Sequence, residues 1–256
     1  MTGRAERQGL PIRAFAPNAI TILALCAGLT GVRFAITGDW KLALACIVGA
    51  GVLDGFDGRI ARLLRAQSKF GAELDSLSDN IAFGTAPALI IFLWSLQDAP
   101  RLGWTVSLAL AVCCALRLAR FNAGIDHKDQ PHKSAGFNTG VPAPVGAGLA
   151  FVPIYLWLIS GNDVFRSWML VMPWTLFIAL LMISSVPTYT WSSIRIRRGW
   201  RLLALAGVAL FGAALLNEPW WTLLGISVLY LALLPMSVLS YAAVRRRRVS
   251  QAVPAS

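Results

Sequence analysis

Four aspartates, Asp54, Asp57, Asp75 and Asp79, are the residues whose type and spacing most clearly suggest chemistry. They lie in a sequence that is 57% hydrophobic and only 14% charged. Carboxylates are costly inside a bilayer and by default mark a functional site. A cluster of oxygen ligands favours hard divalent cations such as Mg²⁺ or Mn²⁺. Two such ions, about 3.5–4 Å apart, can clamp a phosphoryl group in an in-line displacement, so the aspartates predict metal-assisted phosphoryl transfer.

Three residues next to the first two aspartates fit a ligand that carries phosphate. At about 100° per residue, Gly58, Ala61 and Arg62 fall on the same helical face as those aspartates. The two small residues leave room for a ligand, and the arginine offers a planar pair of donors to a phosphate. The last two aspartates, with Gly71 one turn before them, share a face of the next helix. We expect the two acidic faces to oppose each other.

The composition places these helices in a membrane. The chain has 256 residues and a mean hydropathy of +0.64, and its charged fraction is well below the roughly 25% of a soluble domain. Apolar runs long enough to cross a bilayer recur along the chain. We therefore predict an all-α integral membrane protein, a bundle of about eight transmembrane helices. The predicted spans are 17–37, 41–61, 72–96, 102–121, 141–160, 167–187, 201–216 and 220–243.

The basic residues predict how the chain is oriented. Most of the 23 Lys and Arg residues would lie on one side of the bundle, and such an excess marks the cytoplasmic face. Both termini and the active site then lie on the cytoplasmic side of a multi-pass protein of the cell (inner, cytoplasmic) membrane. Topology and anionic lipid explain the net charge of +11, so we expect no nucleic-acid partner. The predicted parts are a basic interfacial arm 1–14, a catalytic core 15–190, additional transmembrane helices 191–244 and a basic disordered tail 245–256.

The aspartate stretch resembles the signature of the CDP-alcohol phosphatidyltransferases. That pattern is Asp-x-x-Asp-Gly-x-x-Ala-Arg, eight residues, then Gly-x-x-x-Asp-x-x-x-Asp. The chain matches every fixed position, namely Asp54, Asp57, Gly58, Ala61, Arg62, Gly71, Asp75 and Asp79. The resemblance implies a phosphatidyl transfer from CDP-diacylglycerol in the lipid bilayer, with two divalent metal ions, Mg²⁺ or Mn²⁺, and it suggests a homodimer.

The resemblance also implies a role for each site residue. Asp54, Asp57 and Asp75 look like ligands of a first metal. The second metal shares Asp54 and Asp75 and adds Asp79, which also resembles the general base for the acceptor hydroxyl. The residues expected to bind CDP-diacylglycerol are Asn18, Thr21, Gly58, Ala61, Arg62, Ser68 and Gly71. For Asn18 an alternative stays open, a helix cap just after Pro17.

A second resemblance narrows the branch of the family. The stretch Ala115-Leu-Arg-Leu-Ala-Arg-Phe-Asn122, followed by Gly140-Val-Pro-Ala-Pro144, resembles phosphatidylserine synthases, with a valine where a leucine is usual. It implies L-serine as the small polar acceptor. Arg117, Arg120 and Asn122 are candidates to bind its carboxylate or a lipid phosphate. Snorkelling toward the cytoplasmic surface is the alternative for either arginine alone.

Several alternatives remain open at this stage. The acceptor could instead be inositol phosphate, glycerol 3-phosphate or choline. A different class is a divalent-cation transporter, although such sites are expected near the membrane midplane. An intramembrane prenyltransferase would need a second aspartate-rich motif, which the sequence lacks. A polar network that only fixes helix packing would leave the four acids with excess charge. His127 and His132 fall in a polar segment that is either a solvated loop or a lid over the site.

Overall fold

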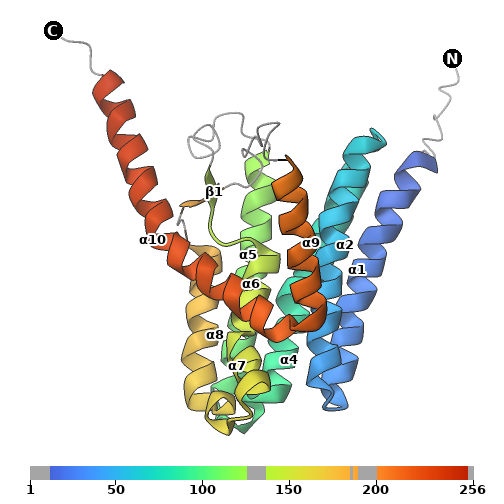
Figure 1. The fold of residues 1–256 in the computed structure, drawn as a ribbon, viewed down its shortest axis with the longest axis vertical. Helices are drawn as coiled ribbons and strands as arrows, with labels where there is room; N and C mark the ends of the chain where they lie inside the picture. Colours follow the sequence, from blue (N-terminus) through green and yellow to red (C-terminus); the bar gives the residue numbers. More distant parts are fainter. Residues whose placement is uncertain (1–11, 126–136, 185–186, 190–200, 253–256) are drawn as a thin grey trace, which may run out of the picture.

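The computed structural model describes residues 12–125, 137–184, 187–189 and 201–252. In this part of the chain the helices form eight rods, as predicted, and most of them run side by side (Figure 1). The elements are α1 Ile12–Ile36, α2 Trp40–Leu63, α3 Lys69–Asp79, η1 Asn80–Thr85, α4 Ala86–Trp94, η2 Leu96–Asp98, α5 Gly103–Ile125, β1 Phe137–Thr139, α6 Ala143–Ala150, α7 Val152–Ser160, η4 Asp163–Arg166, α8 Trp168–Ile183, β2 Pro187–Tyr189, α9 Arg201–Asn217 and α10 Pro219–Ala252.

The described part of the chain is all-helical, as predicted, apart from one short pair of strands. Strands β1 and β2 pair antiparallel over three residues each, with Phe137 opposite Tyr189. This pair joins two segments that lie far apart in the sequence, so no local periodicity announces it. The tail predicted to be disordered from residue 245 is corrected as far as Ala252, where α10 ends, and the last four residues lie outside the described part of the chain. The two histidines of the predicted loop lie outside the described residues.

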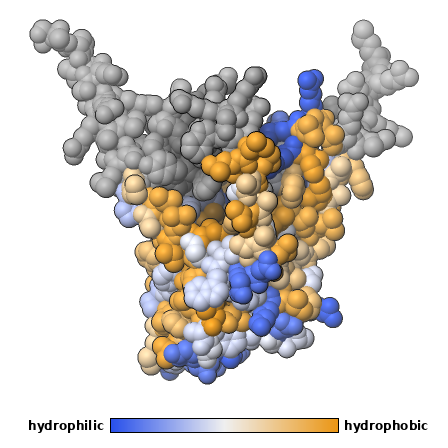
Figure 2. Space-filling view, in the orientation of Figure 1, coloured by the Kyte–Doolittle hydropathy of each residue, from blue (hydrophilic) through white to orange (hydrophobic). Residues whose placement is uncertain are grey.

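Apolar side chains cover much of the surface, as a bilayer environment requires. Leu63, Leu202 and Leu216 are each more than four-fifths exposed. Figure 2 shows apolar residues over much of one face and a concentration of hydrophilic residues toward its lower end. By length and composition, five described segments can cross a membrane. They are Phe15–Ile36, Lys69–Trp94, Gly103–Gly124, Ala143–Ser160 and Pro219–Met236. The chain is therefore a multi-pass membrane protein, and the total of eight spans stays a prediction.

Helices α1 and α2 form a tight hairpin that carries the first half of the site. Gly38 allows the turn with a φ of 77°, and Asp39 caps α2 by accepting a hydrogen bond from the Leu42 amide at 3.1 Å. Near the turn the helices touch, since a Cβ on Gly31 would lie 2.9 Å from the Ala43 carbonyl oxygen. This contact aligns the far ends of both helices, where the site residues lie.

Helices α3 and α4 form one rod that is interrupted by the π-helical segment η1. Pro87 near the start of α4 explains the interruption, since its ring would collide with the Phe83 carbonyl in a regular α-helix. The wider turns, such as the Ala86 amide to the Ile81 carbonyl, relieve that clash. The π segment begins directly after Asp79, so the irregular backbone starts at the last motif aspartate.

Several helices begin or end on the same side of the bundle as the aspartate motif. Helix α1 begins, and α10 ends, on the upper side in Figure 1. Helix α2 ends and α3 begins on that same side, joined by a short turn in which Arg65 has a φ of 50°. The aspartate motif therefore lies toward the end of the bundle where both terminal helices also end.

Candidate active site at the aspartate cluster

The structure brings the four motif aspartates together, as the sequence predicted. One carboxylate oxygen from each of Asp54, Asp57 and Asp75 lies within 4.8 Å of the other two. The carboxyl groups of Asp54 and Asp79 lie within hydrogen-bonding reach of each other. Like charges this close repel strongly at low dielectric. Divalent cations fit the cluster because every ligand is a hard oxygen and the ligands come from two facing helices.

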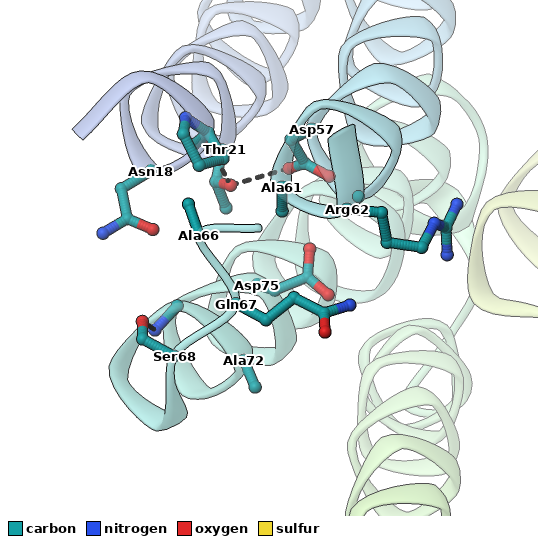
Figure 3. Close-up of a pocket in the computed structure, with 13 residues that line it drawn as sticks. Asn18, Thr21, Asp57, Ala61, Arg62, Ala66, Gln67, Ser68, Ala72 and Asp75 are labelled. Carbon is teal, nitrogen blue, oxygen red and sulfur yellow. Dashed lines mark hydrogen bonds between the residues drawn. The ribbon is translucent and has the colours of Figure 1, made fainter. Parts of the chain in front are cut away.

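Helix α1 holds one of these aspartates in place. The Thr21 hydroxyl lies 2.6 Å from Oδ2 of Asp57 and 3.1 Å from the Pro17 carbonyl oxygen (Figure 3). It has one hydrogen to donate, and the shorter contact goes to the carboxylate. Thr21 and Asp57 are each only 5% exposed, so water does not compete strongly for this bond. The sequence placed Thr21 in the donor pocket, and the structure adds this second role.

Ser78 ties α3 to the same point of α1. Its buried hydroxyl donates to the Thr21 carbonyl oxygen at 3.0 Å. The sequence reasoning did not single out Ser78. Its position three residues after Asp75 places it on a neighbouring part of the same helical face, which is the signal that could have identified it. Through Thr21, the two acidic helices are thus fixed relative to each other.

A pocket of about 270 Å³ opens beside the cluster. Figure 3 shows residues from α1, α2 and α3 around it, with the Asp75 carboxylate directed toward α2. The lining residues are Pro17, Asn18, Thr21, Asp57, Gly58, Ala61, Arg62, Ala66, Gln67, Ser68, Gly71, Ala72 and Asp75. All seven residues expected to bind the donor are among them. Pro17 belongs to the α1 stretch that carries Asn18 and Thr21, whereas Ala66, Gln67 and Ala72 were not singled out, because the α2–α3 turn brings them here.

Two pocket residues also shape the start of α3. Ser68 is the N-cap of α3 and accepts a hydrogen bond from the Gly71 amide at 3.0 Å. A Cβ on Gly71 would lie 3.1 Å from Oδ1 of Asn18 and 3.2 Å from the Ser68 hydroxyl. Glycine therefore lets α1 and α3 approach each other at the pocket wall.

The capping alternative for Asn18 is wrong. Helix α1 begins at Ile12 and contains Pro17, so Asn18 lies inside the helix rather than at its start. Its side chain is directed to the pocket side, close to Gly71. Pro17 lacks an amide hydrogen, so α1 continues past it without the usual bond to the carbonyl four residues earlier.

The three candidates for acceptor binding lie on α5, away from this pocket. Arg120 donates from Nη1 to the Ile183 carbonyl oxygen at 3.0 Å and from Nη2 to that of Ser184 at 3.1 Å. It thereby satisfies the last carbonyl groups of α8. Asn122 donates from Nδ2 to the Ser76 hydroxyl at 2.8 Å and links α5 to α3. Both side chains therefore have protein partners.

Arg117 differs from its two neighbours. Its side chain is half-buried, and its guanidinium lies within charge–charge range of Asp79. Its Nε is buried and has no hydrogen-bond partner among the described residues. Of the three candidates, Arg117 is the one that lies toward the aspartate cluster and whose Nε has no partner among the described residues.

Comparisons with known proteins agree with the motif. A family model described as CDP-alcohol phosphatidyltransferase matches residues 14–181, and one described as CDP-alcohol phosphatidyltransferase 2 matches residues 199–235. The second match covers all of α9 and the first half of α10.

Curated relatives carry a common name. A Mycobacterium tuberculosis protein named CDP-diacylglycerol–serine O-phosphatidyltransferase is 37% identical over 234 residues, covering 91% of this chain and 81% of the relative. A Mycobacterium leprae protein of the same name is 36% identical, covering 93% and 79%. One from Methanocaldococcus jannaschii, also of that name, is 32% identical and covers 65% and 70%. The chain belongs to the CDP-alcohol phosphatidyltransferase family.

Proposed function

We propose that the chain is an enzyme that transfers the phosphatidyl group of CDP-diacylglycerol to L-serine, giving phosphatidylserine and CMP. One observation carries this proposal. The pocket that contains every expected donor-binding residue shares Asp57 and Asp75 with the aspartate cluster. A nucleotide-activated lipid in that pocket would place its pyrophosphate at the carboxylates. Relatives over 91–93% of the chain bear the name of this reaction.

The four aspartates would together hold two Mg²⁺ or Mn²⁺ ions. Asp54, Asp57 and Asp75 would hold one ion, while Asp54, Asp75 and Asp79 would hold the other. Bound ions would neutralise the pyrophosphate and stabilise charge on the attacking and leaving oxygens. Thr21 keeps the Asp57 carboxylate oriented through its 2.6 Å contact.

The donor is held by the pocket walls. Gly58 has nothing within 4 Å of a Cβ built on it, so a ligand can approach the α2 backbone there. Arg62 is exposed at the pocket edge and offers a planar fork to a donor phosphate. Asn18 and Ser68 contribute polar groups on the α1 and α3 sides. These groups position the CDP part while the acyl chains stay in the bilayer.

The chemical step is a direct displacement at phosphorus. Asp79 accepts the proton of the serine hydroxyl as that oxygen attacks the phosphorus of the diacylglycerol-linked phosphate. A new phosphorus–oxygen bond forms to serine, and the bond to the bridging pyrophosphate oxygen breaks. CMP leaves with that oxygen and its electron pair. Atoms and charge balance without any redox partner.

The topology forms part of the proposal. The active site faces the cytoplasm, where serine is available and CMP is released, and the membrane is the cell's inner membrane. Both terminal helices then end on the cytoplasmic side, as the shared end of α1 and α10 in Figure 1 supports. The enzyme acts as a homodimer. Cysteine labelling from each side of sealed vesicles and crosslinking in the membrane would test these two points.

An acceptor assay tests the function itself. Purified protein in nanodiscs would receive CDP-diacylglycerol, Mn²⁺ or Mg²⁺ and labelled serine, inositol phosphate, glycerol 3-phosphate or choline in separate reactions. We expect labelled lipid and equimolar CMP with serine only. Transfer to one of the other compounds, and not to serine, would identify that compound as the acceptor in place of serine. Metal uptake into sealed vesicles without any CMP release would favour a transporter instead.

A further inference from the structure

Helix α5 and the α3–η1 rod run antiparallel and touch at two defined points. At one point, a Cβ on Gly84 would lie 2.9 Å from Cβ of Cys114. At the other, Asn122 donates to Ser76 at 2.8 Å. In both contacts the two residue numbers add to the same value, so the register between the helices is continuous. Residues between these contacts that lie on the inner faces of the two helices are therefore close to one another.

Asn80 and Arg117 lie between these two contacts, at similar heights along their helices. Asn80 lies about one turn from Gly84, and Arg117 lies about one turn from Cys114 in the corresponding direction. Oδ1 of Asn80 is 3.2 Å from a Cβ built on Gly84, which places the amide at the α5 side of the rod. Asn80 directly follows Asp79 in the chain. Asn80 and Arg117 therefore both lie near the aspartate that we assign as the base, one next to it in the chain and the other within charge–charge range.

Both side chains bury a polar atom that the described residues leave without a hydrogen-bond partner. These atoms are Oδ1 of Asn80, an acceptor, and Nε of Arg117, a donor. Burying such an atom unpaired costs about 1–3 kcal/mol, and more for a charged group. A ligand that supplies an anionic acceptor and a cationic donor would recover both costs. The carboxylate and ammonium of an α-amino acid, attached to one carbon, are such a pair.

Helix α10 reaches the same place from another direction. Tyr230 lies within charge–charge range of Arg117, and its hydroxyl oxygen is buried. The start of α10 is anchored by Trp220, whose ring stacks on Tyr155 of α7 at 6.4 Å between centroids. Tyr230 also lies within the second family match, which covers residues 199–235.

The geometry also separates this cluster from the donor pocket. The pocket is lined by α1, α2, the turn and α3, and it includes Asp57 and Asp75 but no residue of η1, α5 or α10. Asn80, Arg117 and Tyr230 lie on those three elements, on the Asp79 side. An in-line displacement needs the attacking and leaving oxygens on opposite sides of phosphorus. An acceptor and a nucleotide held by different elements around the aspartates are compatible with that need.

We infer that Asn80 and Arg117 form the acceptor subsite for a zwitterionic hydroxy amino acid, with Tyr230 as a positioning residue. Arg117 binds the carboxylate, the Asn80 amide oxygen accepts from the ammonium, and Tyr230 orients the Arg117 guanidinium. The serine hydroxyl then points to Asp79. This inference rests on the proposed function and names the part of the site that selects the acceptor.

The test uses three acceptors that differ in one group each. Serine has both charged groups, ethanolamine lacks the carboxylate, and 3-hydroxypropionate lacks the ammonium. Steady-state rates would be measured on the purified full chain in nanodiscs with CDP-diacylglycerol and Mn²⁺. Asn80→Leu, Arg117→Gln and Tyr230→Phe are the variants. Tyr155→Phe is the control, because Tyr155 is a buried tyrosine that stacks on Trp220 at the α7–α10 contact.

Each variant has its own expected signature. Arg117→Gln should raise the serine KM about 10- to 100-fold and abolish the preference for serine over ethanolamine. Asn80→Leu should mainly abolish the preference for serine over 3-hydroxypropionate. Tyr230→Phe should raise the serine KM several-fold. In all three, the donor KM should stay within about twofold of the wild-type value. Tyr155→Phe should change neither preference.

The outcomes separate the inference from the function on which it rests. A wild-type enzyme that does not use serine would overturn the proposed function. A wild-type enzyme that uses serine, with both preferences unchanged in Asn80→Leu and Arg117→Gln, would overturn the inference alone. Stabilisation by CDP against heat checks that each variant is folded. If Arg117→Gln fails that check, Arg117→Lys replaces it, and an unchanged serine KM there would equally contradict the assignment.

Discussion

The Thr21 hydroxyl on α1 lies 2.6 Å from the Asp57 carboxylate on α2. Both partners of this bond are buried, and it joins α1 to the aspartate motif. A ligand carboxylate that is fixed by such a partner presents its second oxygen to a cation in one orientation. Because Ser78 bonds the carbonyl of the same threonine at 3.0 Å, one residue of α1 connects both acidic helices.

Thr21→Val should weaken metal use without unfolding the protein. Valine keeps the shape of the side chain but cannot hold Asp57, so the Mn²⁺ concentration for half-maximal activity should rise about 10- to 100-fold. Thr30→Val is the matched control, since Thr30 on the same helix bonds only the Cys26 carbonyl, at 2.6 Å. Equal metal dependence in both variants would show that Thr21 has no role at the metal site.

Gly71→Ala should narrow the donor pocket. The new methyl group would lie 3.1 Å from Oδ1 of Asn18, closer than ordinary contacts, so α1 and α3 must separate or the pocket must shrink. We expect the KM for CDP-diacylglycerol to rise about tenfold, the size of a moderate overpacking cost. Gly148→Ala is the control, because nothing lies within 4 Å of a Cβ there. A donor KM that stays at the wild-type value would show that the pocket wall at Gly71 does not contact the donor.

Arg62→Lys should impair use of the donor. A lysine keeps the charge but replaces a planar fork with a single point, so kcat/KM for CDP-diacylglycerol should fall about tenfold. Arg59→Lys serves as the comparison, because Arg59 is also exposed on α2 but does not line the pocket. If both variants lose the same activity, the effect belongs to the general charge of this helix end and not to Arg62.

Much of this site could be predicted from the sequence because the motif is local. Asp54 to Asp79 lie on two consecutive helices, so helical spacing alone brings them to facing surfaces. Five of the seven residues expected to bind the donor lie in the same stretch, and together with Asn18 and Thr21 of α1 they line one pocket. The role of Thr21 toward Asp57 was missed, because the contact of α1 with α2 depends on a glycine and a turn far from the motif.

Other features depend on packing between distant segments. Arg120 was a candidate for acceptor binding, yet it bonds the carbonyl groups of Ile183 and Ser184. Nothing in the local sequence shows that α8 ends beside it. The π segment after Asp79 likewise follows from Pro87 eight residues later. The strands β1 and β2 pair across a long separation, which periodicity does not reveal.

Arg120→Gln should therefore affect stability more than catalysis. Losing the two bonds to the end of α8 should lower the midpoint of thermal unfolding by roughly 2–4 °C, measured in detergent with a thermal-shift assay. The folded variant should keep the serine KM of the wild type. A large rise in serine KM at unchanged stability would instead return Arg120 to the acceptor site.

The most direct measurement is the comparison of wild type and Asp79→Asn in donor binding and turnover. The account predicts that the variant still binds CDP-diacylglycerol, since Asp79 does not line the donor pocket. It also predicts that phosphatidylserine and CMP formation fall by at least about 100-fold, because no base receives the serine proton. Near-normal turnover in Asp79→Asn would contradict the assignment of the base and, with it, the proposed mechanism.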